Sequence, residues 1–177
     1  RAGKKRLVYH HLHRLHVRQP QSVYLLQALE QLRRLEPGFC ARLRIRIVGR
    51  VGEAILQRIR TSTVNDLFEY IPYVTHHISL SHLKSSDAAL LIIDDAPANK
   101  GIVTGKVYEY IGAGLPILAL AAEGDAADLI RQHQLGVVVP PNDVDGIIRA
   151  NKTLYAGGGP GTGEAGALFE RKHLTGR

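Results

Sequence analysis

The stretch AALLIIDDAPANKGIVTGKVYEYIGAGLPILAL, residues 88–120, is the most informative part of the sequence for the fold class. It opens with a continuous apolar run, Ala88 to Ile93, of the kind that fills a central strand of a parallel sheet. A helical pattern over residues 106–111 comes next, and a second apolar run over residues 116–120 comes after it. Strand, helix and strand in this order predict two parallel strands joined by a right-handed crossover.

The same alternation extends in both directions from this stretch. Upstream, apolar residues at helical spacing predict a helix over residues 22–35, and residues 43–48 predict a strand with a basic face at Arg44 and Arg46. We therefore predict an α/β fold, a Rossmann-like doubly wound parallel sheet, for residues 21–177. The other expected elements are helices at 53–66, 78–85, 126–134 (with Gly136 as its cap), 144–155 and 167–174, and strands at 68–74 and 137–139.

The net charge of +7 is concentrated at one end of the chain. Residues 1–20 hold six Lys or Arg and no acid, whereas the remainder has 17 basic and 16 acidic residues. This basic segment also contains four histidines, and we treat it as a domain start or a linker end. Such a segment can bind nucleic acid, an anionic membrane or phosphate, or it can be a solvated tail. A metal site on the histidines lacks a neighbouring acid or cysteine to complete it.

Composition excludes several classes of protein. No apolar run approaches the roughly 20 residues of a membrane-spanning helix, and no signal peptide opens the sequence. The single cysteine, Cys40, can form no internal disulfide, which is typical of a reducing compartment. We expect a cytoplasmic protein, with peripheral contact to the inner face of a membrane left open. Because the chain starts at Arg1 and contains no Met, we also expect it to be a piece of a longer protein.

The loop that opens the helix at residue 106 has the chemistry of a phosphate site. Free amides at a helix start and the helix dipole favour a phosphate, and Gly101 and Gly105 let backbone approach a ligand. Lys106 adds a positive charge, and Glu109 can accept hydrogen bonds from paired hydroxyls such as those of a ribose. The alternative is an ordinary loop with a solvated acid. The pattern is not a P-loop, because Val107 stands where a Ser or Thr would hold magnesium.

The run GKVYEYIGAGLPILA, residues 105–119, resembles a stretch of the glycosyltransferase family 4-like group. The segments GDAADLI at residues 124–130, LGVVVPPND at residues 135–143 and FERKHLT at residues 169–175 resemble later stretches of that group. This resemblance covers about residues 22–177 in the expected order. It implies the C-terminal half of a GT-B enzyme, in which two Rossmann-like domains face each other and the C-terminal one holds a nucleoside diphosphate sugar.

The resemblance also implies roles for particular residues. It matches Glu109 to the donor ribose, and Thr104, Gly105 and Lys106 to the diphosphate. It places Tyr73 and Val74 at the base, largely through backbone. It leaves Arg14, or Arg18, as the cation of the first loop. Many members carry a glutamate eight residues before the ribose glutamate, where this chain has Gly101, and the first loop here contains no glycine.

The sequence therefore predicts the donor-binding domain of a hexosyltransferase-type enzyme that moves a sugar from a nucleoside diphosphate sugar to an acceptor hydroxyl. We expect no metal and no other cofactor, because a cation and the helix amides would stabilise the departing diphosphate. The expected partners are the nucleotide sugar and an N-terminal Rossmann-like domain of the same chain, without which the fragment would be inactive. Two alternatives stay open: a non-catalytic nucleotide- or sugar-binding module, and a nucleic-acid-binding domain that uses residues 1–20.

Overall fold

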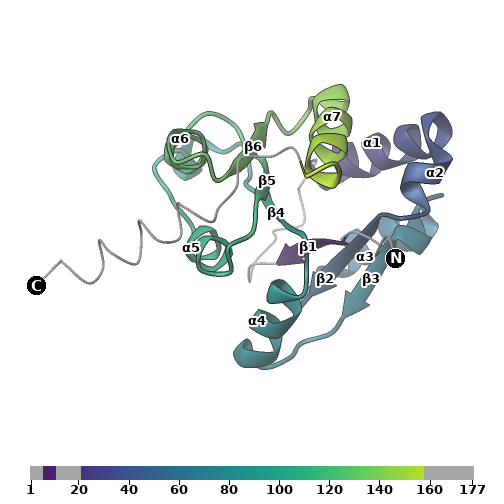
Figure 1. The fold of residues 1–177 in the computed structure, drawn as a ribbon, viewed down its shortest axis with the longest axis horizontal. Coiled ribbons are helices and arrows are strands. Elements are labelled where there is room, and N and C mark those ends of the chain that lie inside the picture. Colours follow the sequence, from purple (N-terminus) through teal and green to yellow (C-terminus); the bar gives the residue numbers. More distant parts are fainter. Residues whose placement is uncertain (1–5, 11–20, 158–177) are drawn as a thin grey trace, which may run out of the picture.

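The computed structural model describes residues 6–10 and 21–157 (Figure 1). Within these ranges six strands form one parallel sheet in the order β3-β2-β1-β4-β5-β6. The chain runs outward from β1 to β3, returns to the centre at β4, and then runs outward to β6. This topology confirms the predicted Rossmann-like fold. The strands are β1 (Arg6–His10), β2 (Arg44–Val48), β3 (Phe68–Ile71), β4 (Ala88–Ile92), β5 (Ile117–Leu120) and β6 (Gly136–Val139).

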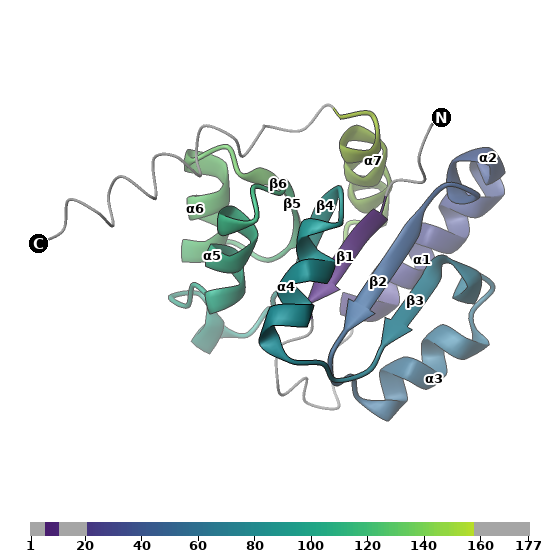
Figure 2. The ribbon, with the colours of Figure 1, turned by 60° about the horizontal axis from the view of Figure 1, so that its bottom comes forward.

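Helices cover both faces of the sheet (Figure 2). Helices α1, α3 and α7 pack on one face, with Leu29 and Ile147 in their shared core, and α1 lies beside α7. Helices α4, α5 and α6 pack on the other face around Val107 and Ile130. The helices are α1 (Gln21–Leu35), α2 (Pro37–Cys40), α3 (Glu53–Thr61), α4 (His76–Lys84), α5 (Gly105–Gly112), α6 (Asp125–Gln132) and α7 (Val144–Tyr155), with 3-10 turns η1 (Asn65–Leu67) and η2 (Pro97–Asn99).

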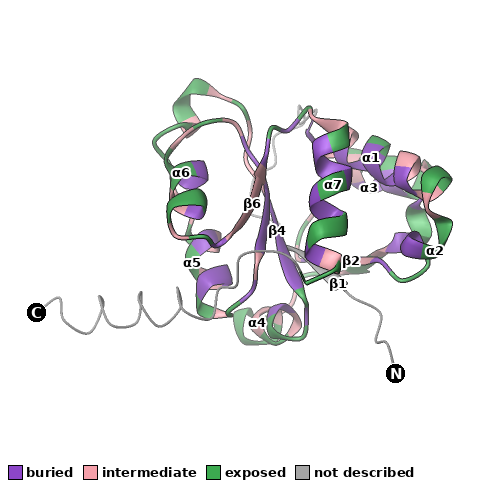
Figure 3. Ribbon diagram, turned by 45° about the horizontal axis from the view of Figure 1, so that its top comes forward, coloured by how far each residue is buried: buried purple, intermediate pink, exposed green. Residues whose placement is uncertain are grey.

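Strand β4 lies between the two helix layers and is buried along most of its length (Figure 3). Its side chains alternate between the faces: Leu90 belongs to the core under α1 and α7, whereas Ala89 and Leu91 belong to the core under α5 and α6. A strand covered on both faces has no polar side, which explains the continuous apolar run that identified it in the sequence.

The sheet begins inside the basic segment, residues 1–20, for which the sequence left open a domain start or a linker end. Strand β1 pairs with β2 on one side and with β4 on the other, so Arg6–His10 is at the centre of the sheet. A five-residue strand between charged residues and histidines is hard to recognise in the sequence. Its position in the sheet comes from its pairing with β2 and β4. Arg14, Arg18, the histidines from residue 11 onward and the helix predicted at 167–174 lie outside the described residues.

Most predicted elements are present, with corrections at their ends. Strand β3 stops at Ile71, three residues early, because Pro72 has no N–H for the ladder. Helix α3 stops at Thr61, five residues early, and η1 replaces its last turn. Gly136 does not cap α6. Gln134 takes the left-handed conformation there, with φ of 50°, and Gly136 opens β6 instead.

On the basic face predicted for β2, Arg46 is buried and paired with a half-exposed glutamate. Arg46 is 4% exposed, and its Nε lies 3.0 Å from Glu69 Oε2 on β3. Its Nη1 donates to Ser85 Oγ at 3.0 Å and to the His82 carbonyl oxygen at 3.4 Å, both at the end of α4. Arg46 therefore ties two strands and α4 together, and its neighbours Ile45 and Ile47 point to the opposite, apolar face.

Candidate functional site

The carboxyl edge of the sheet gathers the loops in which the sequence predicts a ligand site. All strands are parallel, so every strand ends at this edge. The direction of the chain reverses between β1 and β4, and crevices at such a point are where open α/β sheets bind ligands. The described loops at this edge are residues 49–52, 72–75, 94–104, 121–124 and 140–143.

The start of α5 is open to a ligand. Thr104 occupies the N-cap position, with φ of −72° and ψ of 149°, but its side chain makes no capping hydrogen bond. Its Oγ1 is buried and has no hydrogen-bond partner among the described residues. The first amides of a helix, here those of Gly105 and Lys106, have no acceptor within the helix. An uncapped helix start beside an unsatisfied hydroxyl offers donors to an anion.

Lys106 and Glu109 form an ion pair on the first turn of α5. Lys106 Nζ lies 3.0 Å from Glu109 Oε2, and the two side chains are 16% and 26% exposed. The sequence predicted a separate role for each of these residues. Their spacing of three residues on a helix brings the two side chains together. Glu109 is not sealed in the interior, because Val107 and Tyr110 take the buried positions of this turn. A half-shielded pair of this kind can exchange its partner for a ligand group.

Tyr73 and Val74 follow β3 at the same edge. Strand β3 is the third strand away from β4, the strand that leads toward α5. At the usual strand separation this distance is about 14 Å, so a ligand touching both regions must be extended. Tyr73 is 64% exposed, and the Arg50 guanidinium carbon lies 5.3 Å from its ring centroid. Arg50 was not among the site residues predicted from the sequence. Its position directly after Gly49, where the strand ends, could have placed it at this edge.

Two further titratable groups have shifted pKa values, one at this edge and one at the opposite end of the fold. Arg131 holds the pKa of the Glu123 carboxyl below its ordinary value through hydrogen bonds of 2.6 and 2.9 Å. Burial raises the pKa of the Cys40 thiol, which lies at the opposite end of the fold, so it is a poor nucleophile. Among the residues that the structure describes, no three His, Cys, Asp or Glu side chains cluster as metal ligands would.

A family model for glycosyl transferases group 1 matches residues 6–156 of this chain. The match begins at β1 and runs past the end of α7, so it covers the whole described sheet. The chain belongs to this family. No curated protein sequence matches the chain.

Solved structures show the same fold for this group 1 glycosyltransferase domain. An α,α-trehalose-phosphate synthase (UDP-forming) from Burkholderia vietnamiensis has a TM-score of 0.66 at 12% identity over 87% of this chain and 38% of that one. The apo lipopolysaccharide outer core galactosyltransferase WaaB has a TM-score of 0.62 at 14% identity, over 89% and 42%. The S. aureus MnaA–UDP co-structure has a TM-score of 0.60 at 14% identity, over 89% and 40%.

These similar structures are all longer than this chain. The chain spans roughly two fifths of the length of the structures it resembles. Identities this low establish the fold and leave substrates open. In the described part of the chain, none of the helices combines the length and the apolar character needed to cross a bilayer.

Proposed function

We propose that this domain binds the nucleoside diphosphate of a nucleotide sugar, as the donor half of a glycosyltransferase. The observation that carries the proposal is the first turn of α5. There, uncapped amides, the unsatisfied Thr104 hydroxyl and a half-shielded Lys106–Glu109 pair adjoin one another. Membership of the group 1 family and the resemblance to UDP-forming and UDP-bound proteins support it.

The two partners of the ion pair can contact two different groups of the ligand. A diphosphate oxygen that approaches the α5 amides competes with Glu109 for the Lys106 ammonium group. Glu109 is then free to accept hydrogen bonds from the two ribose hydroxyls. Charge-assisted hydrogen bonds of this kind are about twice as strong as neutral ones. A ligand that carries both a ribose and a diphosphate should therefore bind more tightly than a ligand that carries only one of these groups.

The rest of the ligand would extend along the edge of the sheet toward β3. The base would lie near Tyr73 and Val74, and the sugar near the loop that contains Gly101. In transfer, the bond from the anomeric carbon to the diphosphate breaks, a bond to the acceptor oxygen forms, and the acceptor loses its proton. The α5 amides, the helix dipole and a cation would stabilise the charge that develops on the departing diphosphate. Cytoplasmic location and independence of metal stay predictions.

A second candidate is a nucleotide-sugar-binding module without transfer activity. Gly101 favours it, because the resemblance to the family 4-like group implies a glutamate at this position, and glycine offers no side chain to the sugar. Structurally the position is open, since a Cβ placed on Gly101 would meet no atom within 4 Å. A glutamate could therefore be introduced there without a clash. The full-length protein with Gly101→Glu would gain sugar-dependent affinity if the missing carboxylate limits donor recognition.

The test is calorimetric titration of the chain with UDP, GDP, ADP and their glucose conjugates. We expect one base to be preferred, and Glu109→Gln to weaken binding of that nucleotide by about 10- to 100-fold. Glu53→Gln is the matched control, because Glu53 is an exposed acid in the first turn of α3 at the same edge. Absence of binding to every nucleotide, or equal effects of both substitutions, would overturn the proposal. Transfer assays on the full-length protein then separate the two candidates.

A further inference from the structure

Two loops at the carboxyl edge touch each other backbone to backbone. Lys100 belongs to the loop between β4 and α5, and Gly124 and Asp125 belong to the turn between β5 and α6. The Asp125 amide donates a 2.8 Å hydrogen bond to the Lys100 carbonyl oxygen. Gly124 lies against the same carbonyl: a Cβ placed on Gly124 would lie 2.6 Å from Lys100 O and 3.1 Å from Lys100 Cα. Only a residue without a side chain permits this contact.

Space, and not backbone conformation, requires the glycine at this position. Gly124 has φ of 160° and ψ of −178°, which is extended backbone that other residues also adopt. Gly101 and Gly105, in the neighbouring loop and at the start of α5, have no atom within 4 Å of a Cβ placed on them. The clash at Gly124 is with main-chain atoms, which cannot rotate away as a flexible side chain does. A larger residue must therefore move one loop relative to the other.

The loop held by this contact leads directly to the proposed diphosphate site. Between Lys100 and Thr104 it carries Gly101 and Ile102, which are both exposed. The Ile102 amide bonds within the same loop, to the Asn99 carbonyl oxygen, so it gives no anchor to the rest of the fold. Val103, the last residue before Thr104, packs against the core under α5 and α6. The backbone contact with the start of α6 holds the other end of this segment, at Lys100.

We infer that Gly124 is a positioning residue for the donor site. Because Gly124 has no side chain, the Asp125 amide can reach the Lys100 carbonyl oxygen. This hydrogen bond positions the loop that leads to the α5 amides. The inference rests on the proposed function for the identity of the ligand. The contact between the loops does not depend on that function, so the two can fail separately.

The first experiment measures amide hydrogen exchange in peptides that cover residues 97–104 and 124–128. Gly124→Ala introduces the clash. Asp125→Pro removes the donor and points a ring carbon at the Lys100 carbonyl oxygen, so it breaks the same contact from the neighbouring residue, although proline itself is well accepted at the first position of a helix. Both should speed exchange over residues 97–104. Lys100→Ala, which keeps the carbonyl group, and Gly38→Ala, whose Cβ meets nothing within 4 Å, should leave it unchanged. Unchanged exchange in both test variants would overturn the inference, and Asp125→Pro decides it if Gly124→Ala does not fold.

The second experiment titrates the same variants with the nucleoside diphosphate preferred by the wild-type chain. Gly124→Ala and Asp125→Pro should weaken binding by about three- to tenfold. Leu154→Ala, a core truncation in the last turn of α7, is the control for general destabilisation and should bind normally while folded. Faster exchange with unaltered affinity would overturn the positioning role. Faster exchange in a chain that binds no nucleotide would support the loop contact and overturn the proposed function instead.

Discussion

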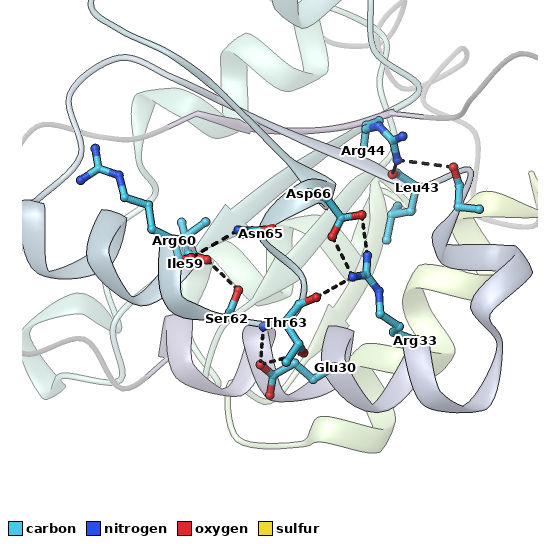
Figure 4. A network of polar contacts seen from close by, with 11 residues as sticks. Glu30, Arg33, Leu43, Arg44, Ile59, Arg60, Ser62, Thr63, Asn65 and Asp66 are labelled. Carbon is cyan, nitrogen blue, oxygen red and sulfur yellow. Dashed lines mark hydrogen bonds and ion pairs between the residues drawn. The ribbon is translucent and has the colours of Figure 1, made fainter.

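The two edges of the sheet use their polar groups in opposite ways. At the amino edge, charged side chains from different elements pair with one another. Arg33 of α1 bonds Asp66 and the Thr63 carbonyl oxygen, and Glu30 accepts from Thr63 (Figure 4). Lys152 at the end of α7 pairs in the same way with Glu36.

At the carboxyl edge the ion pairs stay within one helix or between a helix and the loop that leads into it. Lys106 pairs with its helical neighbour Glu109, and the buried Thr104 hydroxyl has no partner among the described residues. The Arg50 guanidinium lies over the exposed Tyr73 ring. Polar groups at the amino edge therefore join separate elements, whereas the described pairs at the carboxyl edge join no two helices, and Thr104 and the Lys106–Glu109 pair can meet a ligand there.

The largest effect is expected from Gly136→Ala, near the amino edge. A Cβ on Gly136 would lie 1.9 Å from the Ile117 carbonyl oxygen, so β5 and β6 could not keep their pairing. We expect a loss of more than about 3 kcal/mol in the free energy of unfolding, measured by urea denaturation. Any folded fraction should bind nucleotide with normal affinity. A stable variant with impaired binding would contradict the division between the edges.

Glu109→Ala at the carboxyl edge should show the reverse pattern. The carboxylate is partly exposed, so its removal should change the free energy of unfolding by less than about 1 kcal/mol. Nucleotide affinity should fall by at least about tenfold, because a charge-assisted contact is lost. Calorimetry and urea denaturation on one preparation measure both quantities. A variant that loses stability but keeps its affinity would show that Glu109 is architectural.

The pair between β2 and β3, in which only the arginine is buried, gives a finer contrast with the pairs at the two edges. Glu69→Gln leaves the Arg46 guanidinium buried without its counter-charge, and we expect a cost of about 1–3 kcal/mol. Arg46→Met removes the buried charge and should cost less, since Glu69 is half-exposed and can be hydrated. Chemical denaturation of both variants measures the order. The opposite order would mean that the arginine stabilises through its bonds to α4 more than through Glu69.

The smallest effect is expected from Asp66→Asn in the amino-edge network. The Arg33 guanidinium holds the pKa of the Asp66 carboxyl below its ordinary value. A lowered pKa in the folded state contributes stability above the unfolded value of about 3.9, and this contribution is lost as the pH falls through the folded value. The substitution should therefore cost less than about 1 kcal/mol at neutral pH, since the pair is exposed.

The pH profile is the specific readout for Asp66→Asn. Its difference from wild type should be constant from pH 7 to about pH 5 and vanish in stronger acid. Thermal unfolding followed across this range measures the difference. A gap that widens as the pH falls would contradict the assigned role of Asp66.

The layers of this protein and one arm of its candidate site could be predicted from the sequence. Apolar runs such as Ala88–Ile92 are continuous because burial on two faces permits no polar side chain, so the order of strands and helices could be read along the chain. Thr104, Lys106 and Glu109 are close in sequence and share one helical turn, so their neighbourhood followed from helical spacing.

The contacts made across the sheet could be known only from the folded chain. Folding placed Arg6–His10 at the centre of the sheet, buried Arg46 against Glu69, and set Arg50 on Tyr73. It also explained Gly124, whose missing side chain matters only because the Lys100 carbonyl lies against it. Contacts between residues distant in the chain depend on strand order and packing, and a local pattern carries no record of either.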